Sequence, residues 1–416
     1  MTLKTSMLRK TLLASAIAIA MAGANAYAQD VTIWTLNFTS EAANNAIQKV
    51  ATDFEAANPG VNVEIVTRGV DDHKTALRVA AGSDKGPDIY FSWAGLGLGG
   101  EYINAGFSLP LDKYYAEYKW DDRLTASSLS FSKIYKGGRH GVPFTFKGEA
   151  VYYNKALFKQ AGIEKLPESY AELVAAAEKL KAAGIPAITF GGMVNWHVMR
   201  LMDVILESKC GAKKHDALKN MQADWTAEPC ATASFAELST WSKNYILSPF
   251  MGIDQSQSFN LFVGGRAAMM LEGDWLVQQL SEAGNLDGYD IFPFPTGTGR
   301  LYGFAEYHYI SSKSPNSNLA AKFLDYFNST PVQQELLGKI STTSVNKNVT
   351  YSNLRPMDKK WLDIFNKYTD VYMNGDQAFP LDVTTEYFRV INEVASGNIA
   401  AADAAKQLQT FISNRK

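Results

Sequence analysis

The chain has 416 residues, of which 42 are acidic and 40 are basic, so its formal net charge at pH 7 is −2. This balance excludes the strongly basic surface that binding to nucleic acid or to an anionic membrane requires. Beyond the N-terminal segment no run of about 18 apolar residues occurs, so no membrane-embedded part is expected. A chain of this length exceeds what one hydrophobic core usually supports, and two lobes are therefore predicted.

The N-terminal segment has the pattern of a secretory signal peptide. Lys4, Arg9 and Lys10 precede the apolar run TLLASAIAIAMAGA, and the small residues of AYA (residues 26–28) follow it. We expect cleavage after Ala28, since the run is short for a membrane anchor and no cysteine is available there for a lipid. Cleavage would change the net charge from −2 to −5, because three cationic residues are removed. The predicted compartment is a bacterial periplasm.

Two cysteines, Cys210 and Cys230, occur in the chain. In an oxidising compartment a pair of cysteines favours a disulfide, and two free buried thiols are the alternative.

From residue 31 onward the hydrophobic pattern alternates between strands and helices. Ser40 is a candidate N-cap for the first helix, and Asn58-Pro59-Gly60 supplies its stop. This β-α-β-α-β order is typical of a parallel, doubly wound sheet. The expected elements are strands at 31–36, 61–68 and 87–93, with helices between Ser40 and Asn58 and from 71 to Gly82.

A similar order returns further along the chain. The pattern predicts a helix at 169–184, a strand at 186–192, and a helix end, strand and loop over 260–275. The closing third is mostly amphipathic helix, at 318–330, 331–340 and 399–412. We therefore predict two α/β lobes, several chain crossings between them and a cleft at their junction.

The stretch DIYFSWAGLGLGG contains a G-x-G-x-x-G match at Gly95, Gly97 and Gly100. A dinucleotide site needs these glycines to open a long helix after the first strand. Here they follow the third strand, and EYINAGF (101–107) supplies at most two helical turns. We expect no nucleotide and no other cofactor, and we interpret the glycines as a tight turn of the backbone away from the sheet.

Catalytic and metal-binding motifs are missing from the sequence. No nucleophile elbow or phosphate loop occurs, and the five histidines show no ligand spacing, so no metal is expected.

Aromatic and hydrogen-bonding residues follow the predicted strands, where ligands of open α/β sheets bind. A sugar needs such a mixture, because its C–H face stacks on an aromatic ring while its hydroxyl groups need donors and acceptors. Four other tryptophans (Trp120, Trp225, Trp241 and Trp361) are expected to be core or surface anchors, and Trp34, which lies in the first predicted strand, could also belong to a core. The candidate ligand-binding residues are Asn37, Phe38, Ser92, Trp93, Lys147, Glu149, Trp196, His197, Arg200, Asp274, Trp275, Glu306 and His308.

Several stretches, in their order and spacing, resemble one family over nearly the whole mature chain. They include FEAANPGVNVEI, GPDIYFSW, VPFTFKGEAVYYNKALFKQAGI, LPESYAEL, FVGGRAAMMLEGDW, ISSKSPNSNLAAKFLDYF and EVASGNIAAADAAKQL. The chain is similar to the extracellular solute-binding proteins of bacterial carbohydrate ABC transporters, which are relatives of the maltose-binding protein. The resemblance implies a non-enzymatic, monomeric sugar carrier that closes around its ligand and hands it to the membrane permease subunits.

The resemblance also implies a two-lobed periplasmic-binding-protein fold of the class II type, α/β throughout. Lobe 1 would hold residues 29–140 and 305–345, and lobe 2 would hold 141–304 and 346–416. The chain would cross between them near Gly141-Val142-Pro143 and near Gly303. Ser341 to Thr343 and Asp382 are weaker ligand-contact candidates carried over from the family.

Two departures from the family pattern leave alternatives open. The Cys210 to Cys230 region is not a general family feature, and the cluster WHVMR (196–200) is particular to this chain. The solute could then be a sugar acid, a polyol or glycerol phosphate. An exported carbohydrate-active enzyme would instead use two of the carboxylates Glu149, Asp274 and Glu306.

Overall fold

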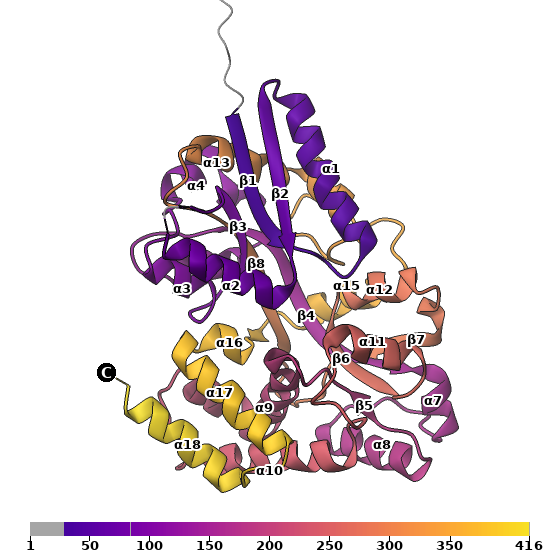
Figure 1. Ribbon diagram of the computed structural model, residues 1–416. Coiled ribbons are helices and arrows are strands. Elements are labelled where there is room, and N and C mark those ends of the chain that lie inside the picture. The colour runs from indigo at the N-terminus through magenta and orange to yellow at the C-terminus, as the bar shows by residue number, and fades with distance from the viewer. Residues whose placement is uncertain (1–28, 84, 416) are drawn as a thin grey trace, which may run out of the picture.

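The computed structural model describes residues 29–83 and 85–415, and the predicted signal peptide (1–28) lies outside the described residues. The strands of the described part form one nine-stranded sheet with the order β2-β1-β3-β8-β4-β6-β5, while β7 pairs with β4 and β9 pairs with β8 (Figure 1). The strands are β1 (Gln29–Leu36), β2 (Val61–Arg68), β3 (Ile89–Trp93), β4 (Val142–Asn154), β5 (Ile188–Thr189), β6 (Met269–Gly273), β7 (Tyr289–Phe292), β8 (Leu301–Ile310) and β9 (Val371–Tyr372).

Helices cover both halves of this sheet. We call the half that contains β1, β2 and β3 lobe 1, and the half that contains β5, β6 and β7 lobe 2. Two short 3₁₀ turns, Phe131–Lys133 and Leu286–Gly288, accompany the α-helices. The helices are α1 (Glu41–Ala57), α2 (Val70–Ala81), α3 (Gly99–Asn104), α4 (Asp112–Tyr118), α5 (Trp120–Arg123), α6 (Ala126–Ser130), α7 (Lys155–Gln160), α8 (Tyr170–Ala182), α9 (Asn195–Lys219), α10 (Pro229–Asn244), α11 (Gln255–Val263), α12 (Leu276–Glu282), α13 (Ser317–Phe327), α14 (Thr330–Leu336), α15 (Pro356–Lys367), α16 (Gly375–Ala378), α17 (Leu381–Ala395) and α18 (Ala401–Ser413).

Local sequence signals explain several of these boundaries. Ser40 accepts a hydrogen bond from the Ala43 amide and begins α1, as predicted. Ser169 and Glu172 form a reciprocal capping box at the start of α8. Gly82 ends α2, again as predicted.

The sheet is mixed, and the parallel arrangement predicted for the first three strands is present within it. β2, β1 and β3 are parallel to one another, and β5 is parallel to β6. The central pairs β3–β8, β8–β4 and β4–β6 are antiparallel. The local strand-helix-strand pattern could not reveal them, because each joins strands that are far apart in the sequence.

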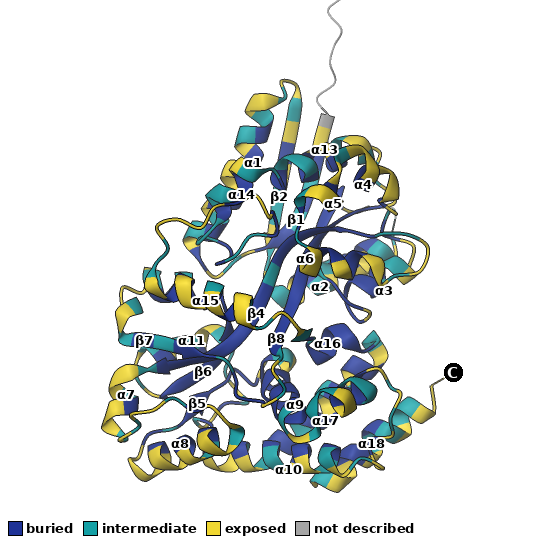
Figure 2. Cartoon of the chain, turned by 180° about the vertical axis from the view of Figure 1, so that it is seen from behind, coloured by how far each residue is buried: buried dark blue, intermediate teal, exposed yellow. Residues whose placement is uncertain are grey.

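Two long central strands connect the lobes. β4 pairs with β8 from Val142 opposite His308 to Glu149 opposite Tyr302. Beyond Glu149, β4 continues into lobe 2 beside β6 and β7, while the far end of β8 pairs with β3 in lobe 1. Figure 2 shows both strands as largely buried ribbons that run from one half of the molecule to the other.

The predicted crossings at Gly141-Val142-Pro143 and at Gly303 fall at the start of β4 and inside β8. The lobe boundaries after residues 140 and 345 stay a prediction.

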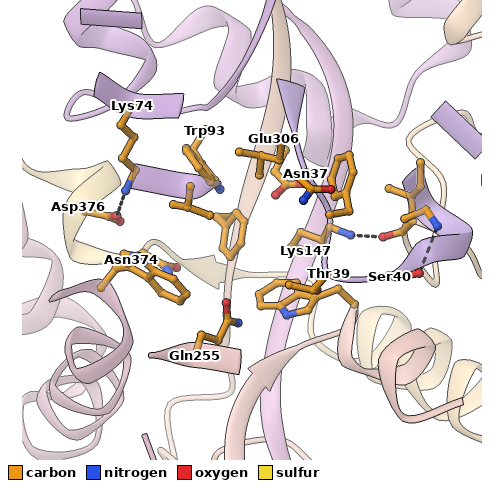
Figure 3. A pocket seen from close by; sticks show the side chains of 18 of the residues that line it. Asn37, Thr39, Ser40, Lys74, Trp93, Lys147, Gln255, Glu306, Asn374 and Asp376 are labelled. Atoms are coloured by element: carbon orange, nitrogen blue, oxygen red, sulfur yellow. Dashed lines mark hydrogen bonds and ion pairs between the residues drawn. The ribbon is translucent and has the colours of Figure 1, made fainter. Parts of the chain in front are cut away.

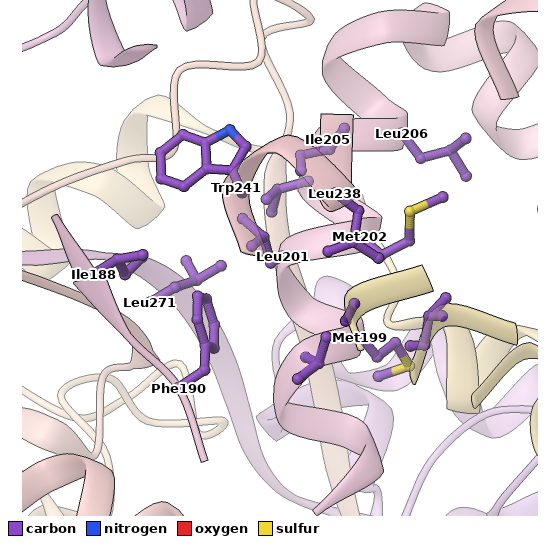
Figure 4. Close-up of a cluster of buried hydrophobic side chains, with 14 of the residues drawn as sticks. Ile188, Phe190, Met199, Leu201, Met202, Ile205, Leu206, Leu238, Trp241 and Leu271 are labelled. Atoms are coloured by element: carbon purple, nitrogen blue, oxygen red, sulfur yellow. The ribbon is translucent and has the colours of Figure 1, made fainter. Parts of the chain in front are cut away.

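Each lobe has its own large hydrophobic core. In lobe 1, α1 and α13 bury Phe54 and Phe323 against the sheet. In lobe 2, α9 and α10 pack Met202 and Leu238 against β5 and β6 (Figure 4). The tryptophans predicted to be structural are fully buried, namely Trp120, Trp225, Trp241 and Trp361.

Cys210 and Cys230 form the predicted disulfide, with Cα atoms 5.1 Å apart, and it ties α9 to α10. No helix in the described ranges combines the length and the apolar character that crossing a membrane requires.

Two glycines of the G-x-G-x-x-G match, Gly95 and Gly97, lie against α16. Gly95 has φ = 131°, and a Cβ there would lie 2.5 Å from the Gln377 carbonyl oxygen. A Cβ at Gly97 would overlap the carbonyl oxygens of Asp376 and Phe379. The Gly97 amide donates to the Gln377 carbonyl at 3.3 Å. The predicted tight turn is present, and it lets this loop of lobe 1 approach the α16 backbone closely.

We expect Gly97→Ala to lower the free energy of unfolding by about 1–3 kcal/mol, because the new methyl group cannot fit against the α16 carbonyls. Urea denaturation would measure this loss. Gly252→Ala is the matched control, since a Cβ at Gly252 meets no atom within 4 Å. An equal loss in the two variants would contradict the contact.

Candidate functional site

A cavity with an empty volume of about 920 Å³, part of it open to solvent, lies between the two lobes (Figure 3). Lobe 1 contributes the loop after β1, one face of α2 and the end of β3, and lobe 2 contributes α9, α11, α16 and the turn after β6. The lining residues are Leu36, Asn37, Phe38, Thr39, Ser40, Ala43, Val70, Lys74, Trp93, Lys147, Trp196, Arg200, Gln255, Trp275, Phe304, Glu306, Lys339, Ile340, Asn374, Asp376 and Gln377.

Three indole rings from both lobes line the cavity. Trp93 ends β3 in lobe 1, whereas Trp196 and Trp275 belong to lobe 2. The guanidinium carbon of Arg200 lies 4.7 Å from the ring centre of Trp196 and 5.1 Å from that of Trp275, so this cation lies close to both rings. The Lys74 ammonium lies 5.0 Å from the ring centre of Trp93. The cavity therefore offers flat apolar surfaces beside fixed polar groups.

Arg200 is held by two buried carboxylates behind the wall of the cavity. Its Nε lies 3.0 Å from Glu149 Oε2, and its Nη1 donates to Glu272 Oε2 at 2.6 Å. His197 Nε2 lies 3.1 Å from Glu272 Oε1, while the Gly191 amide donates to His197 Nδ1. These contacts fix the guanidinium in one orientation.

Burial separates the pKa values of the two carboxyl groups. It raises the pKa of Glu149 to about 8, even though Arg200 opposes the shift. Burial acts in the same direction on Glu272, but Arg200, His197 and Gln255 outweigh it and lower that pKa to about 2. Burial also lowers the pKa of His197, so its imidazole is neutral. Glu272 therefore carries the negative charge that balances Arg200.

A second buried ion pair, between Lys147 and Asp274, connects β4 to the segment 340–342. Lys147 donates to the Ile340 carbonyl, and its ammonium lies 3.8 Å from Asp274 Oδ1. Asp274 Oδ2 accepts 3.0 Å hydrogen bonds from the Ser341 hydroxyl, the Thr342 amide and the Thr342 hydroxyl. Asp274 therefore anchors this segment and does not face the cavity.

The family model for the bacterial extracellular solute-binding proteins matches residues 39–334. The chain belongs to this family.

Individual proteins are similar over much of their length. A Brucella abortus protein named as a binding protein is 28% identical over 302 residues, which cover 67% of each chain. The multiple sugar-binding protein of Streptococcus mutans is 23% identical over 390 residues, 87% of each chain. The solved structure of a chitin oligosaccharide binding protein superimposes with a TM-score of 0.84 at 23% identity, covering 92% of this chain and 98% of the other. At that identity the structure shows the shared two-lobed fold alone.

The solute-binding protein brings eight of the thirteen predicted site residues to the cavity. For these, direct contact with a ligand stays a prediction. They are Asn37, Phe38, Trp93, Lys147, Trp196, Arg200, Trp275 and Glu306.

The other five predicted residues do not line the cavity. Glu149, His197 and Asp274 are buried behind it and position Arg200 or the 340–342 segment. Ser92 is buried within β3, and His308 packs between Phe144 and Phe327 in the lobe 1 core. A residue that follows a predicted strand is expected near the end of the sheet. The sequence does not show toward which face of the sheet its side chain points.

Several lining residues were missed by the sequence analysis. Lys74 comes from the middle of α2, and Asn374, Asp376 and Gln377 come from the segment around α16. The strand before α16 has only two residues, which is too short to recognise from the sequence. A search for polar residues after predicted strands therefore could not find this segment. Asp382, a weaker candidate on α17, instead pairs with Arg415, which lies beyond the end of α18.

Two of the three carboxylates that the enzyme alternative names do not reach the cavity. Of Glu149, Asp274 and Glu306, only Glu306 lines it, and that residue accepts a hydrogen bond from Thr145. Members of this family are binding proteins. Within residues 29–83 and 85–415 no group of three or more His, Cys, Asp or Glu side chains could hold a metal ion.

We expect Glu149→Gln to remove a pH dependence of stability. Between the ordinary pKa of 4.5 and the raised value of about 8, the unfolded chain ionises Glu149 while the folded protein keeps it protonated. The stability contribution of this group is therefore present below pH 4.5 and is lost as the pH rises to 8. Relative to wild type, the variant should gain on the order of a few kcal/mol across that interval.

Urea denaturation at several pH values would measure this difference. Glu168→Gln is the matched control, because Glu168 lies in an exposed ion pair with Lys165. A difference between variant and wild type that stays constant with pH would refute the assignment.

Proposed function

We propose that the protein captures a mono- or oligosaccharide in the cavity between its lobes and delivers it to the permease of an ABC transporter. The observation that carries the proposal is the set of three indoles, Trp93, Trp196 and Trp275, which line one cavity from both lobes beside fixed polar groups. Indole faces stack on the C–H faces of sugar rings, and the polar groups bond to the hydroxyls. The names of the Streptococcus mutans relative and of a Pyrococcus abyssi relative, a maltotriose-binding protein, support a sugar ligand.

We further infer that the protein acts as a monomer without catalytic activity, and that it is exported with cleavage after Ala28. The family's extracellular location supports export. The position of Glu149 and Asp274 behind the cavity wall supports a binding role over hydrolysis.

Capture is proposed to proceed by bending about β4 and β8. A sugar that touches Trp93 on one lobe and Trp275 on the other makes both contacts only when the lobes are together, so it shifts the population toward the closed form. Direct contacts between the lobes indicate that the structure represents that closed form. Lys74 of α2 lies 3.9 Å from Asp376 of α16 on one side of the cavity.

On the other side, Glu282 of α12 binds the N-terminus of α1. Its carboxylate accepts from the Ser40 hydroxyl at 2.8 Å, from the Ala42 amide at 3.1 Å and from the Glu41 amide at 3.3 Å. Gln279 donates to Thr39 beside it. A negative charge is favourable at the N-terminus of a helix, so this contact favours the closed form.

We expect Glu282→Gln to favour the open form, because a neutral amide interacts less well with the α1 N-terminus. Small-angle X-ray scattering should show a larger radius of gyration for the ligand-free variant than for wild type. Saturating sugar should lower both values to the same closed value. Glu168→Gln should behave as wild type, and a wild-type radius that does not change on saturation would count against hinge closure.

We expect Trp93→Ala and Trp275→Ala each to weaken sugar binding by about tenfold or more, because each removes one stacking surface. Isothermal titration calorimetry would measure the affinity. Trp34→Ala is the control, since Trp34 stacks with Arg68 outside the cavity. Full affinity in both cavity variants would exclude these indoles from the site.

A further inference from the structure

Three buried oxygen atoms in the cavity wall have no hydrogen-bond partner within the described residues, namely Asn374 Oδ1, Asp376 Oδ1 and Gln377 Oε1. All three residues line the cavity, although the exposed fractions of Asp376 and Gln377 are only 6% and 2%. Burying an acceptor without a donor costs free energy, so such atoms are expected to be satisfied by something that enters the cavity. A ligand that enters the cavity is therefore expected to donate hydrogen bonds to Asp376 and Gln377.

The backbone of the segment that carries Asp376 and Gln377 is fixed on its buried side by Asp203. Asp203 Oδ2 accepts from the Gly375 amide at 2.7 Å and from the Tyr302 hydroxyl at 2.8 Å, and Oδ1 accepts from the Tyr387 hydroxyl at 2.8 Å. Lys219 pairs with the same carboxylate. The two acceptors are therefore held in place before a ligand arrives, which reduces the entropy that binding would cost.

Every cation that lines the cavity or lies directly behind it already has a carboxylate partner. Among the described residues, these pairs are Lys74 with Asp376 at 3.9 Å, Lys147 with Asp274 at 3.8 Å, Arg200 with Glu272 at 2.6 Å, Lys219 with Asp203, and Lys339 with Glu335 at 3.2 Å.

Two further carboxyl groups, Glu306 in the cavity wall and Glu149 behind it, have no cation of their own in the described part of the chain, and Glu149 keeps its proton beside Arg200. The cavity and its surroundings therefore contain more carboxyl groups than cations. An incoming carboxylate or phosphate group would find no unpaired cation, and it would meet buried groups of its own sign.

We propose that the ligand of this cavity is an uncharged sugar whose hydroxyl groups donate hydrogen bonds to Asp376 and Gln377, and that sugar acids and sugar phosphates are excluded. The proposal rests on the proposed function as a sugar carrier and selects among its substrate classes. Burial raises the pKa of both Asp376 and Glu306, while Lys74 opposes the shift at Asp376 and Lys147 opposes it at Glu306.

Calorimetry with paired sugars tests the proposal. The neutral probes are glucose, galactose, maltotriose and xylotriose, and the charged probes are glucuronic acid, galacturonic acid and glucose 6-phosphate. We expect binding of at least one neutral probe, and every charged probe to bind at least about a hundredfold more weakly. A charged probe that binds as tightly as the best neutral one would overturn the charge exclusion and leave sugar binding intact. No binding of any sugar at millimolar concentration would overturn the proposed function together with this inference.

Two variants test the role of the acceptors. Asp376→Asn should weaken binding of the neutral sugar by about tenfold or more and should reduce the discrimination against its acid, because a charged acceptor is lost. Gln377→Met removes the second acceptor at similar volume and should also weaken binding. Asp382→Asn is the control, since Asp382 pairs with Arg415 away from the cavity. Melting temperatures would confirm folding, and unchanged affinity in both folded cavity variants would refute the assignment.

Discussion

The antiparallel pairing of β4 with β8 is the constraint on which the rest of the structure depends. These strands connect the lobes, and they bring Lys147, Phe304 and Glu306 to the cavity from segments more than a hundred residues apart. At the centre of the pair Gly148 lies opposite Gly303, where a Cβ would meet the Lys147 carbonyl oxygen at 2.6 Å. Gly148 also lies against the side chains of Leu301 and Phe365, so the two glycines permit a close approach of β4, β8 and their neighbours at the centre of the pair.

The buried ion pairs around Arg200 fix the positions of the side chains that face the cavity. Arg200 contacts two carboxylates, and burial divides their ionisation so that Glu272 is charged and Glu149 holds its proton. Buried ion pairs seldom add much stability, because desolvation offsets their attraction. Their value here is positional, since a fixed guanidinium keeps Trp196 and Trp275 at a set distance from the polar groups.

Buried polar groups also fix the position of the hydrogen-bond acceptors in the cavity wall. Asp203 uses its carboxylate to hold the backbone of α16, and Asn374 donates to Glu149, so the segment 374–377 is anchored on its buried side. Its outward oxygens are left for a ligand. The glycine loop of lobe 1 packs on this segment, which places a contact between the lobes next to the oxygens that are proposed to bind the ligand.

The sequence by itself determined the α/β class, the first five elements, the disulfide and four of the aromatic residues of the cavity, but not Phe304. These follow from short-range signals, such as the Ser40 cap and the position of Trp93 directly after a strand. Only the tertiary structure decided that β8 inserts between β3 and β4, and that Asp376 and Lys74 meet across the cavity. Those contacts join segments hundreds of residues apart, and no local pattern encodes which face of a buried strand or helix turns toward the other lobe.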